Sequence, residues 1–298
     1  MNRKILLIII LAISILGILI VLMLNPQIKF NDLCINEDKW NSIVSSRSSA
    51  NLSLKNIKFN YYELIIDDEN SKIYYSVIKN STNKFSPFVS YTANTHNTNV
   101  AILEDEITED KIMNNHEFKV LLYDNNTYRI YGLYCTSFPM LNIVYDEQNA
   151  NGNKNIPMNM YLFSNFDNGI NRVVRSEGTI SENEGEDGVT NYKFSLKMTT
   201  PNNNERDNVI SLLHMRPNSE YYLNAINIGE NDSPLKKDMK GPKEKLDRVE
   251  DRKMISGDDM MPFKEKNEQR VELFINNEYI GLYSLSYNPE AKIKPRNN

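Results

Sequence analysis

Few residues of this sequence stand in a pattern that performs known chemistry. The three histidines, His96, His116 and His214, lack the spacing of metal ligands, so we interpret each as a structural or surface residue. The chain contains no G-x-S-x-G nucleophile elbow, no H-E-x-x-H zinc motif and no glycine-rich phosphate loop. Local motifs alone therefore assign no catalytic residue and no metal ligand.

An acidic stretch, Glu177–Gly188, is the other place where side chains could gather an ion. It holds five acidic residues and three glycines. A calcium loop requires a D-x-[DN]-x-[DN]-G spacing, which is absent here. We therefore favour a solvated loop over a calcium site.

The chain has only two cysteines, Cys34 and Cys135. Two are too few for a disulfide framework or a cysteine-rich zinc site. A single Cys34–Cys135 bridge is compatible with a location outside the cytoplasm. Two buried thiols that form no bridge are the alternative interpretation.

The composition indicates a globular, β-rich body. Hydrophobic residues make up 40% of the chain and aromatic residues 10%, with 17 tyrosines against 11 glycines, which favours strands around a real core. The net charge is −5. A protein of that sign has no general field that attracts nucleic acid, so we expect no nucleic-acid partner.

A long apolar run opens the sequence. Ile5–Leu24 is about 20 residues without a charge, and a helix of that length crosses a hydrocarbon core of about 30 Å. A cleaved signal peptide would have a shorter apolar run that ends in small residues. Arg3 and Lys4 precede the run, so the positive-inside rule places residues 1–4 in the cytoplasm and the body outside it. We expect a single-pass protein of the cell membrane, with the lipid bilayer as the partner of residues 5–24.

The rest of the chain alternates strand-like and turn-like segments. Residues 25–53 are expected to form a stalk with a short helix near Asp38–Val44, and residues 54–135 an antiparallel β domain. Residues 136–287 are β-rich with a densely charged insertion at 233–270, and residues 288–298 form a disordered tail. The expected strands are 58–66, 72–78, 99–103, 117–123, 128–134, 140–145, 158–163, 191–198, 270–275 and 279–285.

Two blocks of this sequence resemble a known family, the CotH spore-coat protein kinases. Val209–Ala225 is similar to that family's LLGMR-x-D-x-D-W-x-LNA block, and Arg270–Tyr283 resembles its VELFINGEYxGLY hairpin. Softer matches lie at Phe138–Ile143 and Tyr192–Leu196. The residues that carry the family motif are Leu212, Leu213, Met215, Arg216, Leu223, Asn224, Ala225, Val271, Glu272, Leu273, Phe274, Asn276, Glu278, Tyr279, Gly281, Leu282 and Tyr283.

The resemblance implies a fold for the second half of the chain. CotH proteins are atypical kinases whose nucleotide sits between a β-rich N-lobe and a later lobe that supplies the metal-binding acids. The expected fold class is therefore α+β, predominantly β. It has one N-terminal transmembrane helix, an antiparallel β domain and a region like the N-lobe of a CotH kinase.

The sequence departs from the family where catalysis takes place. Only fifteen residues follow Tyr283, so the lobe that brings acids to magnesium is missing. Of the family's phosphate-contacting lysines, only Lys193 stays as a candidate contact for ATP, and an exposed strand lysine is the alternative. Glu184, Glu186 and Asp187 could gather a metal, but a flexible loop would hold them poorly.

These observations together predict a membrane-anchored, non-catalytic CotH-like protein without a cofactor, which acts by protein binding or scaffolding. Its partner would be another protein of the cell envelope or the spore coat. A residual or split atypical kinase that binds ATP and Mg²⁺ is one alternative. A cell-surface adhesion or envelope module is the other, and a test for bound ATP separates the kinase from both binding functions.

Overall fold

The computed structural model describes residues 28–60, 62–76, 87–95, 97–104, 111, 117–136, 138–146, 155–167, 170–184, 190–199, 205–226 and 268–287. The expected transmembrane helix at 5–24, the cytoplasmic residues 1–4 and the tail at 288–298 lie outside these residues. So do His96, His116 and nearly all of the charged insertion at 233–270.

The predicted fold class, α+β and predominantly β, is wrong in its helical part. The described residues form strands almost throughout, and their two helices are α2 (Phe30–Leu33) and α3 (Glu37–Ser45). No helix in the described part of the chain is long and apolar enough to cross a membrane. Many tyrosines, isoleucines and phenylalanines are buried on the faces of the sheets, where aromatic and β-branched side chains pack well.

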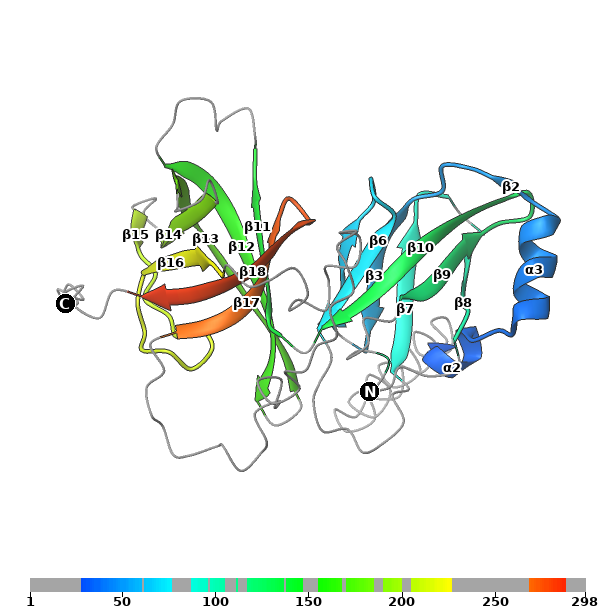
Figure 1. Ribbon diagram of the computed structural model, residues 1–298, viewed down its shortest axis with the longest axis horizontal. Coiled ribbons are helices and arrows are strands. Elements are labelled where there is room, and N and C mark those ends of the chain that lie inside the picture. Colours follow the sequence, from blue (N-terminus) through cyan, green and yellow to red (C-terminus); the bar gives the residue numbers. More distant parts are fainter. Residues whose placement is uncertain are drawn as a thin grey trace, which may run out of the picture.

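Residues 28–136 form two sheets around one core, on the right of Figure 1. Phe59 and Tyr75 come from different sheets and meet edge to face, with ring centroids 5.1 Å apart. The four-stranded sheet has the order β1 (Ile28–Lys29), β7 (Phe88–Ala93), β3 (Leu54–Phe59), β4 (Tyr62–Glu63). The six-stranded sheet has the order β5 (Ile65–Asp67), β6 (Lys72–Ser76), β10 (Thr127–Thr136), β9 (Phe118–Tyr123), β8 (Asn99–Ile102), and β2 (Ser48–Ser49) also pairs with β10.

This half is not the purely antiparallel domain that the sequence predicts. The expected hairpins β5–β6 and β9–β10 are present and antiparallel. However, β10 runs parallel to β6 and to β2. A parallel pair needs a long crossover, and here the chain passes through β7, β8 and β9 between β6 and β10. Local strand signals cannot report such a distant pairing.

Residues 28–53 pack on this half rather than standing apart from it as a stalk. Phe30, Leu33 and Trp40 are buried, and the backbone N–H of Ile35 donates to the carbonyl of Ile102 at 2.9 Å. Asn36 caps α3 by accepting a hydrogen bond from the Lys39 N–H at 3.0 Å. The helix lies close to the expected one, and its apolar side covers the six-stranded sheet.

Residues 140–287 form an eight-stranded sheet, on the left of Figure 1. Because β13 pairs with both β12 and β14, seven of its strands make a closed ring and β15 pairs only with β14. No helix occurs in the described residues of this half. The strand order is β13 (Ile170–Glu184), β12 (Ile156–Asp167), β11 (Met140–Tyr145), β17 (Glu268–Ile275), β18 (Glu278–Tyr287), β16 (Glu220–Ala225), β14 (Thr190–Thr199), β15 (Glu205–Asp207).

The ring closes where β13 changes partner. Residues 170–180 of β13 pair with β12 and residues 177–184 with β14, so both neighbours are present around Gly178. A Cβ atom at Gly178 would lie 2.1 Å from the Ser195 carbonyl oxygen. The close approach of the two backbones therefore requires glycine. This finding also corrects the predicted solvated loop, because residues 177–184 belong to a strand.

The inside of the ring is filled by side chains. Leu162, Phe194, Leu223 and Leu273 are almost completely buried in one apolar cluster. The predicted contact of the β17–β18 hairpin with Leu212, Leu213 and Leu223 is confirmed by that cluster. Val271, Leu273 and Ile275 point inward as the alternation of the sequence predicted.

The turn of the β17–β18 hairpin fixes its own position in the sheet. Asn276 and Asn277 both have positive φ angles, 51° and 72°, as a two-residue type I′ turn requires. The Asn276 side chain accepts a hydrogen bond from the Tyr145 N–H at 2.9 Å. The amide of Asn142 donates to Asn277 Oδ1 at 2.7 Å. The turn of the hairpin is thus hydrogen-bonded to β11, the strand that runs parallel to β17.

Candidate functional site

The two blocks that resemble the CotH family lie side by side in the closed sheet. Strand β16, from the first block, pairs with β18, from the second, so that Ala225 lies opposite Tyr283. Three environments account for the motif residues. The cluster of the ring interior contains Leu212, Leu213, Met215, Leu223, Val271, Leu273 and Tyr283, and the half-buried Ala225 packs against it. Exposed positions are Arg216, Asn224 and Glu278. The remaining motif residues are buried or half-buried elsewhere: Glu272, Phe274, Asn276, Tyr279, Gly281 and Leu282.

Lys193, the candidate phosphate contact, lies on the outer face of the ring in β14. Its Nζ is 2.9 Å from Glu220 Oε2, and it lies over the ring of Tyr222 at 5.5 Å from the centroid. The Tyr222 hydroxyl donates to Glu220 Oε1 at 2.6 Å. Lys193 and Tyr222 are direct cross-strand neighbours, so the pairing of β14 with β16 creates this cluster.

The charges of this cluster neutralise each other. The hydrogen bond to Glu220 raises the pKa of Lys193. Partial burial raises the pKa of Glu220, but hydrogen bonds from Tyr222 and Lys193 outweigh burial and leave it below its usual value. Lys193 is therefore held as the cation of an ion pair, and a phosphate would have to compete with Glu220 for it.

The acidic groups that the sequence offered to a metal lie only partly within the described residues. Within the described part of the chain no three histidine, cysteine, aspartate or glutamate residues are placed to hold a metal ion. Glu184 ends strand β13, whereas Glu186 and Asp187 lie outside the described residues. The two cysteines do not bridge: Cys135 is buried, Cys34 is half-buried, and its thiol donates to the Phe30 carbonyl. Burial raises the pKa of the Cys135 thiol, which keeps that thiol protonated and unreactive.

The joint between the two halves contains a buried carboxylate, Glu272. It belongs to the family-like hairpin, but its side chain points away from the ring interior and is fully buried. The Tyr279 hydroxyl donates to Glu272 Oε2 at 2.7 Å, and the Thr136 hydroxyl donates to Oε1 at 3.3 Å. Thr136 ends β10 of the first half, so this carboxylate links the two halves.

Aromatic rings surround this link and join the two cores. Tyr74 contacts Phe274 with centroids 4.8 Å apart, and Tyr62 contacts Phe163 at 5.6 Å. Phe274 and Phe163 come from the closed sheet but are buried in the same cluster as the first half. The Ser76 hydroxyl also donates to the Phe138 carbonyl at 2.9 Å. The two halves are thus packed together through apolar contacts and hydrogen bonds.

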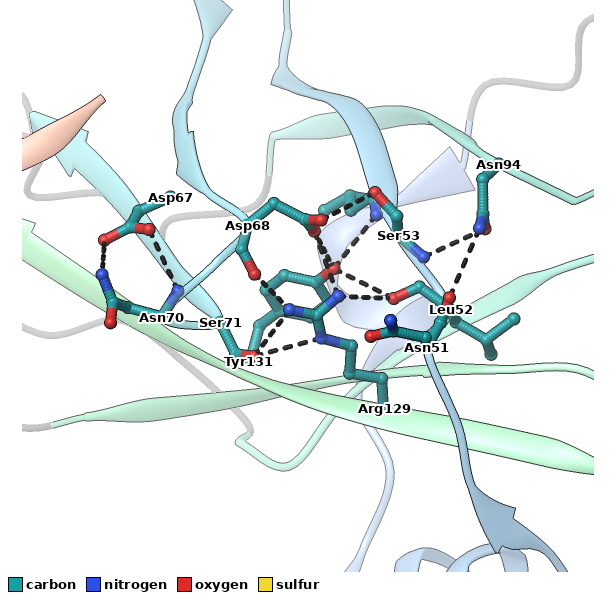
Figure 2. A network of polar contacts seen from close by, with 11 residues as sticks. Asn51, Leu52, Ser53, Asp67, Asp68, Asn70, Ser71, Asn94, Arg129 and Tyr131 are labelled. Carbon is teal, nitrogen blue, oxygen red and sulfur yellow. Dashed lines mark hydrogen bonds and ion pairs between the residues drawn. The ribbon is translucent and has the colours of Figure 1, made fainter. Parts of the chain in front are cut away.

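A dense polar network lies in the first half and centres on Arg129 of β10 (Figure 2). Its guanidinium contacts the Leu52 carbonyl at 2.9 Å, the Ser71 hydroxyl at 3.0 and 3.1 Å, the Asp68 carboxylate at 3.4 Å and the Asp68 carbonyl. These contacts engage all the donors of an arginine side chain. The network therefore holds the turn after β5, at Asp68 and Ser71, and the segment before β3, at Leu52, against strand β10 of the six-stranded sheet.

Tyr131 and Ser53 complete this network. The Tyr131 hydroxyl donates to Asp68 Oδ1 at 2.5 Å and accepts from the Leu54 N–H at 3.1 Å, and the Ser53 hydroxyl donates to Asp68 Oδ2 at 2.9 Å. Burial and the hydrogen bond to Asp68 raise the pKa of Tyr131 to about 12. A shallow, open depression lies beside the network, lined by Ser49, Ala50, Asn51, Ser71, Tyr128, Arg129 and Ile130. Arg129, the one cation among these lining residues, is already engaged by the network.

Sequence analysis missed both Glu272 as a linking residue and the Arg129 network. Glu272 was noted only as part of a motif, and Arg129 and Asp68 are 61 residues apart in the chain. The acidic turn Asp67-Asp68-Glu69-Asn70 followed by a later arginine gives no local signal of contact. Only the parallel pairing of β6 with β10 brings them together.

The described residues form a two-part, mainly β fold, and the polar clusters described above hold elements of that fold together. No known protein family, curated protein or solved structure matches the chain.

Proposed function

We propose that this protein acts by binding another protein, without catalysis, as a divergent relative of the CotH family. The observation that carries the proposal is the ion pair of Lys193 with Glu220, 2.9 Å apart on the outer face of the closed sheet. The residue that the resemblance offers to ATP is thus engaged by a carboxylate of its own sheet. A nucleotide phosphate at that position would meet a negative charge as well as a positive one.

The packing of the molecule supports the same proposal. The ring interior is filled by apolar side chains such as Phe194 and Leu273, and the two halves share a core at the Glu272 joint. Such a body holds its surface in a fixed shape, which suits the presentation of a binding surface. The resemblance implies a protein of the spore coat or the cell envelope as the partner.

Nucleotide binding and phosphate transfer are the direct test of the absence of catalysis. The purified full chain should neither bind ATP with Mg²⁺ at millimolar concentration in calorimetry nor incorporate labelled phosphate into itself or a coat protein. Phosphate incorporation that disappears in Lys193→Ala would overturn the proposal in favour of a residual kinase. Arg206→Ala, which changes an exposed cation on β15, is the control for a general loss of positive charge.

Binding itself is tested by affinity capture from an extract of the source organism. The immobilised full chain should retain a defined protein saturably, and ATP should not release it. If no protein is retained saturably, the binding function is wrong.

A further inference from the structure

The outer edge of strand β7 is an open sheet edge. Strand β3 pairs with β7 along its inner edge, from Val89 to Ala93. On the outer edge β1 pairs only with Phe88 and Val89. The segment Ser90–Ala93, which we call the open β7 edge, therefore has a strand partner on one side only among the described residues.

The direction of the backbone groups follows from two hydrogen bonds. The Phe88 carbonyl accepts from the Asn60 N–H on the inner side, whereas the Pro87 carbonyl accepts from the Phe30 N–H on the outer side. Since successive residues of a strand point their N–H and C=O groups to opposite edges, Tyr91 and Ala93 direct theirs outward. The open β7 edge thus presents two donors and two acceptors in strand geometry.

Two other edges of the described sheets, β15 and β8, are guarded. Strand β15, at the end of the closed sheet, consists of Glu205, Arg206 and Asp207, all exposed, and charged side chains discourage edge pairing. Strand β8 is covered at Ile102, whose carbonyl accepts from the Ile35 N–H at 2.9 Å. The open β7 edge has the sequence Ser-Tyr-Thr-Ala, which contains no charged residue and no proline. Within the described residues no backbone group is hydrogen-bonded to this edge as Ile35 is to Ile102.

The side chains around this edge indicate the chemistry of a partner. Ser90 and Thr92 are exposed on one face, while Tyr91 and Ala93 are half-buried on the other and pack against the core. On the exposed face Lys58 lies opposite Ser90, and Lys29 lies opposite Phe88. Neither lysine forms an ion pair within the described part of the chain. Glu63 lies opposite Lys58 on β4, but its carboxylate is already paired with Arg175 at 3.3 Å. The two lysines therefore leave this face positive, which favours an acidic partner.

We propose that the open β7 edge binds an extended segment of a partner protein by strand addition. The segment has apolar residues beside Tyr91 and acidic or small polar residues beside Ser90 and Thr92. Main-chain hydrogen bonds to Tyr91 and Ala93 supply affinity, and the alternating side chains supply specificity. The inference rests on the proposed binding function and names its surface.

The residues that precede β1 could in principle pair with the open β7 edge, but they fit it less well than a partner segment does. In the register that places Ile28 opposite Val89, the residue opposite Tyr91 would be Pro26, which has no N–H to donate. A second copy of the chain is the other rival, because two such edges could pair antiparallel around a two-fold axis. Sedimentation of the full chain separates this rival from the proposal.

The test is selection of binding peptides from a random display library on the full chain, followed by affinity measurement on variants. Ala93→Pro removes the outward N–H and leaves the ladder to β3 in place, since proline is tolerated at an outward edge position. We expect this variant to lose at least about tenfold in affinity for the selected acidic, alternating peptides. Ala93→Val keeps the N–H and should bind as the wild type does.

A charge exchange on the exposed face is the second measurement, which stays informative if Ala93→Pro does not fold. The double change Ser90→Glu and Thr92→Glu should weaken the same peptides, whereas Ser90→Lys and Thr92→Lys should keep or strengthen them. Equal binding by both pairs, or selected peptides that bind Ala93→Pro normally, would overturn the strand-addition proposal. A dimer that Ala93→Pro abolishes would also overturn it, in favour of a second copy.

Failure of this inference is distinguishable from failure of the proposed function. If the protein captured from the extract is retained equally by the wild type and by Ala93→Pro, binding stands and the edge is the wrong surface. If the wild type retains no protein and selects no peptide, both are wrong.

Discussion

Tyr279 donates a hydrogen bond of 2.7 Å to Glu272, a fully buried carboxylate at the joint between the two halves of the molecule. The two residues lie on neighbouring strands of one hairpin, seven positions apart. The Thr136 hydroxyl reaches the same carboxylate from the first half. The Glu272 carboxylate thus connects its own hairpin in the closed sheet to the first half of the molecule.

Removing the Tyr279 hydroxyl should destabilise the protein. Tyr279→Phe leaves a buried carboxylate with one donor fewer, which costs about 1–3 kcal/mol of unfolding free energy. Urea unfolding followed by circular dichroism measures the change. Tyr128→Phe is the matched control, because Tyr128 is half-exposed, and it should change the free energy by less than about 0.5 kcal/mol. Equal effects of the two changes would show that the Glu272 contact does not matter for stability.

Leu273 tests the packing of the ring interior. Its side chain is fully buried in the cluster that contains Leu212 and Leu223. Leu273→Ala should lower the free energy of unfolding by about 2–5 kcal/mol through lost burial and the remaining cavity. Ile280→Ala, at an exposed position of the same hairpin, serves as the control. A cost below about 0.5 kcal/mol for Leu273→Ala would place residue 273 on the outer face, one residue out of register.

Gly178 tests the closure of the sheet. A methyl group there would meet the backbone oxygen of Ser195 at 2.1 Å, and backbone cannot move aside easily. Gly178→Ala should therefore cost about 1–3 kcal/mol and lower the melting temperature. At Gly132 a methyl group would meet side-chain atoms of Glu117 and Tyr134, which can shift, so Gly132→Ala should cost less. The reverse order of the two melting temperatures would argue against a tight β13–β14 approach.

Arg129 tests the network of Figure 2. Arg129→Lys keeps the charge but loses the planar fork that reaches Leu52, Asp68 and Ser71 together. We expect a loss of about 1–3 kcal/mol and faster amide exchange at residues 51–53 and 68–71. Arg175→Lys is the control, because Arg175 is exposed and contacts only Glu63, at 3.3 Å, in the described ion pairs. Unchanged amide exchange at residues 51–53 and 68–71 in Arg129→Lys would show that Arg129 does not hold these segments in place.

The Lys193–Glu220 pair predicts a pH dependence. Hydrogen bonds from Tyr222 and Lys193 outweigh burial and lower the pKa of Glu220 in the folded state. A lowered carboxyl pKa contributes stability above the unfolded pKa of about 4.3, and this contribution is lost as the pH falls through the folded pKa. Glu220→Gln should thus lower stability at neutral pH by less than about 1 kcal/mol, and the difference should vanish in acid.

The alkaline side supplies a check on the same pair. The pKa of Lys193 is raised by its hydrogen bond to Glu220, so its contribution is present at neutral pH and lost as the pH rises through that pKa. Lys193→Gln should therefore approach the wild type in unfolding experiments at high pH. A difference between Glu220→Gln and the wild type that stays constant from acid to neutral pH would show that the pair does not form in solution.

The sequence by itself determined where many strands begin and end and which way their side chains point. Alternation at Val271, Leu273 and Ile275 predicted the inward face of the hairpin, and the structure confirms it. Asn276 and Asn277 marked its turn, since asparagine tolerates the positive φ angles that a tight hairpin needs. These are local properties, set by the pleat of a strand and by the dihedral angles of a few residues.

Tertiary structure alone decided how the strands are ordered. The closed ring depends on β13 pairing with two strands, and the Arg129 network depends on the parallel pairing of β6 with β10. Neither pairing leaves a local pattern, because hydrogen-bond partners far apart in the chain are chosen by the packing of whole sheets. The same reason applies to Lys193. The alternation of its strand predicts that its side chain faces outward, but its carboxylate partner, Glu220, is set by the pairing of β16 with β14.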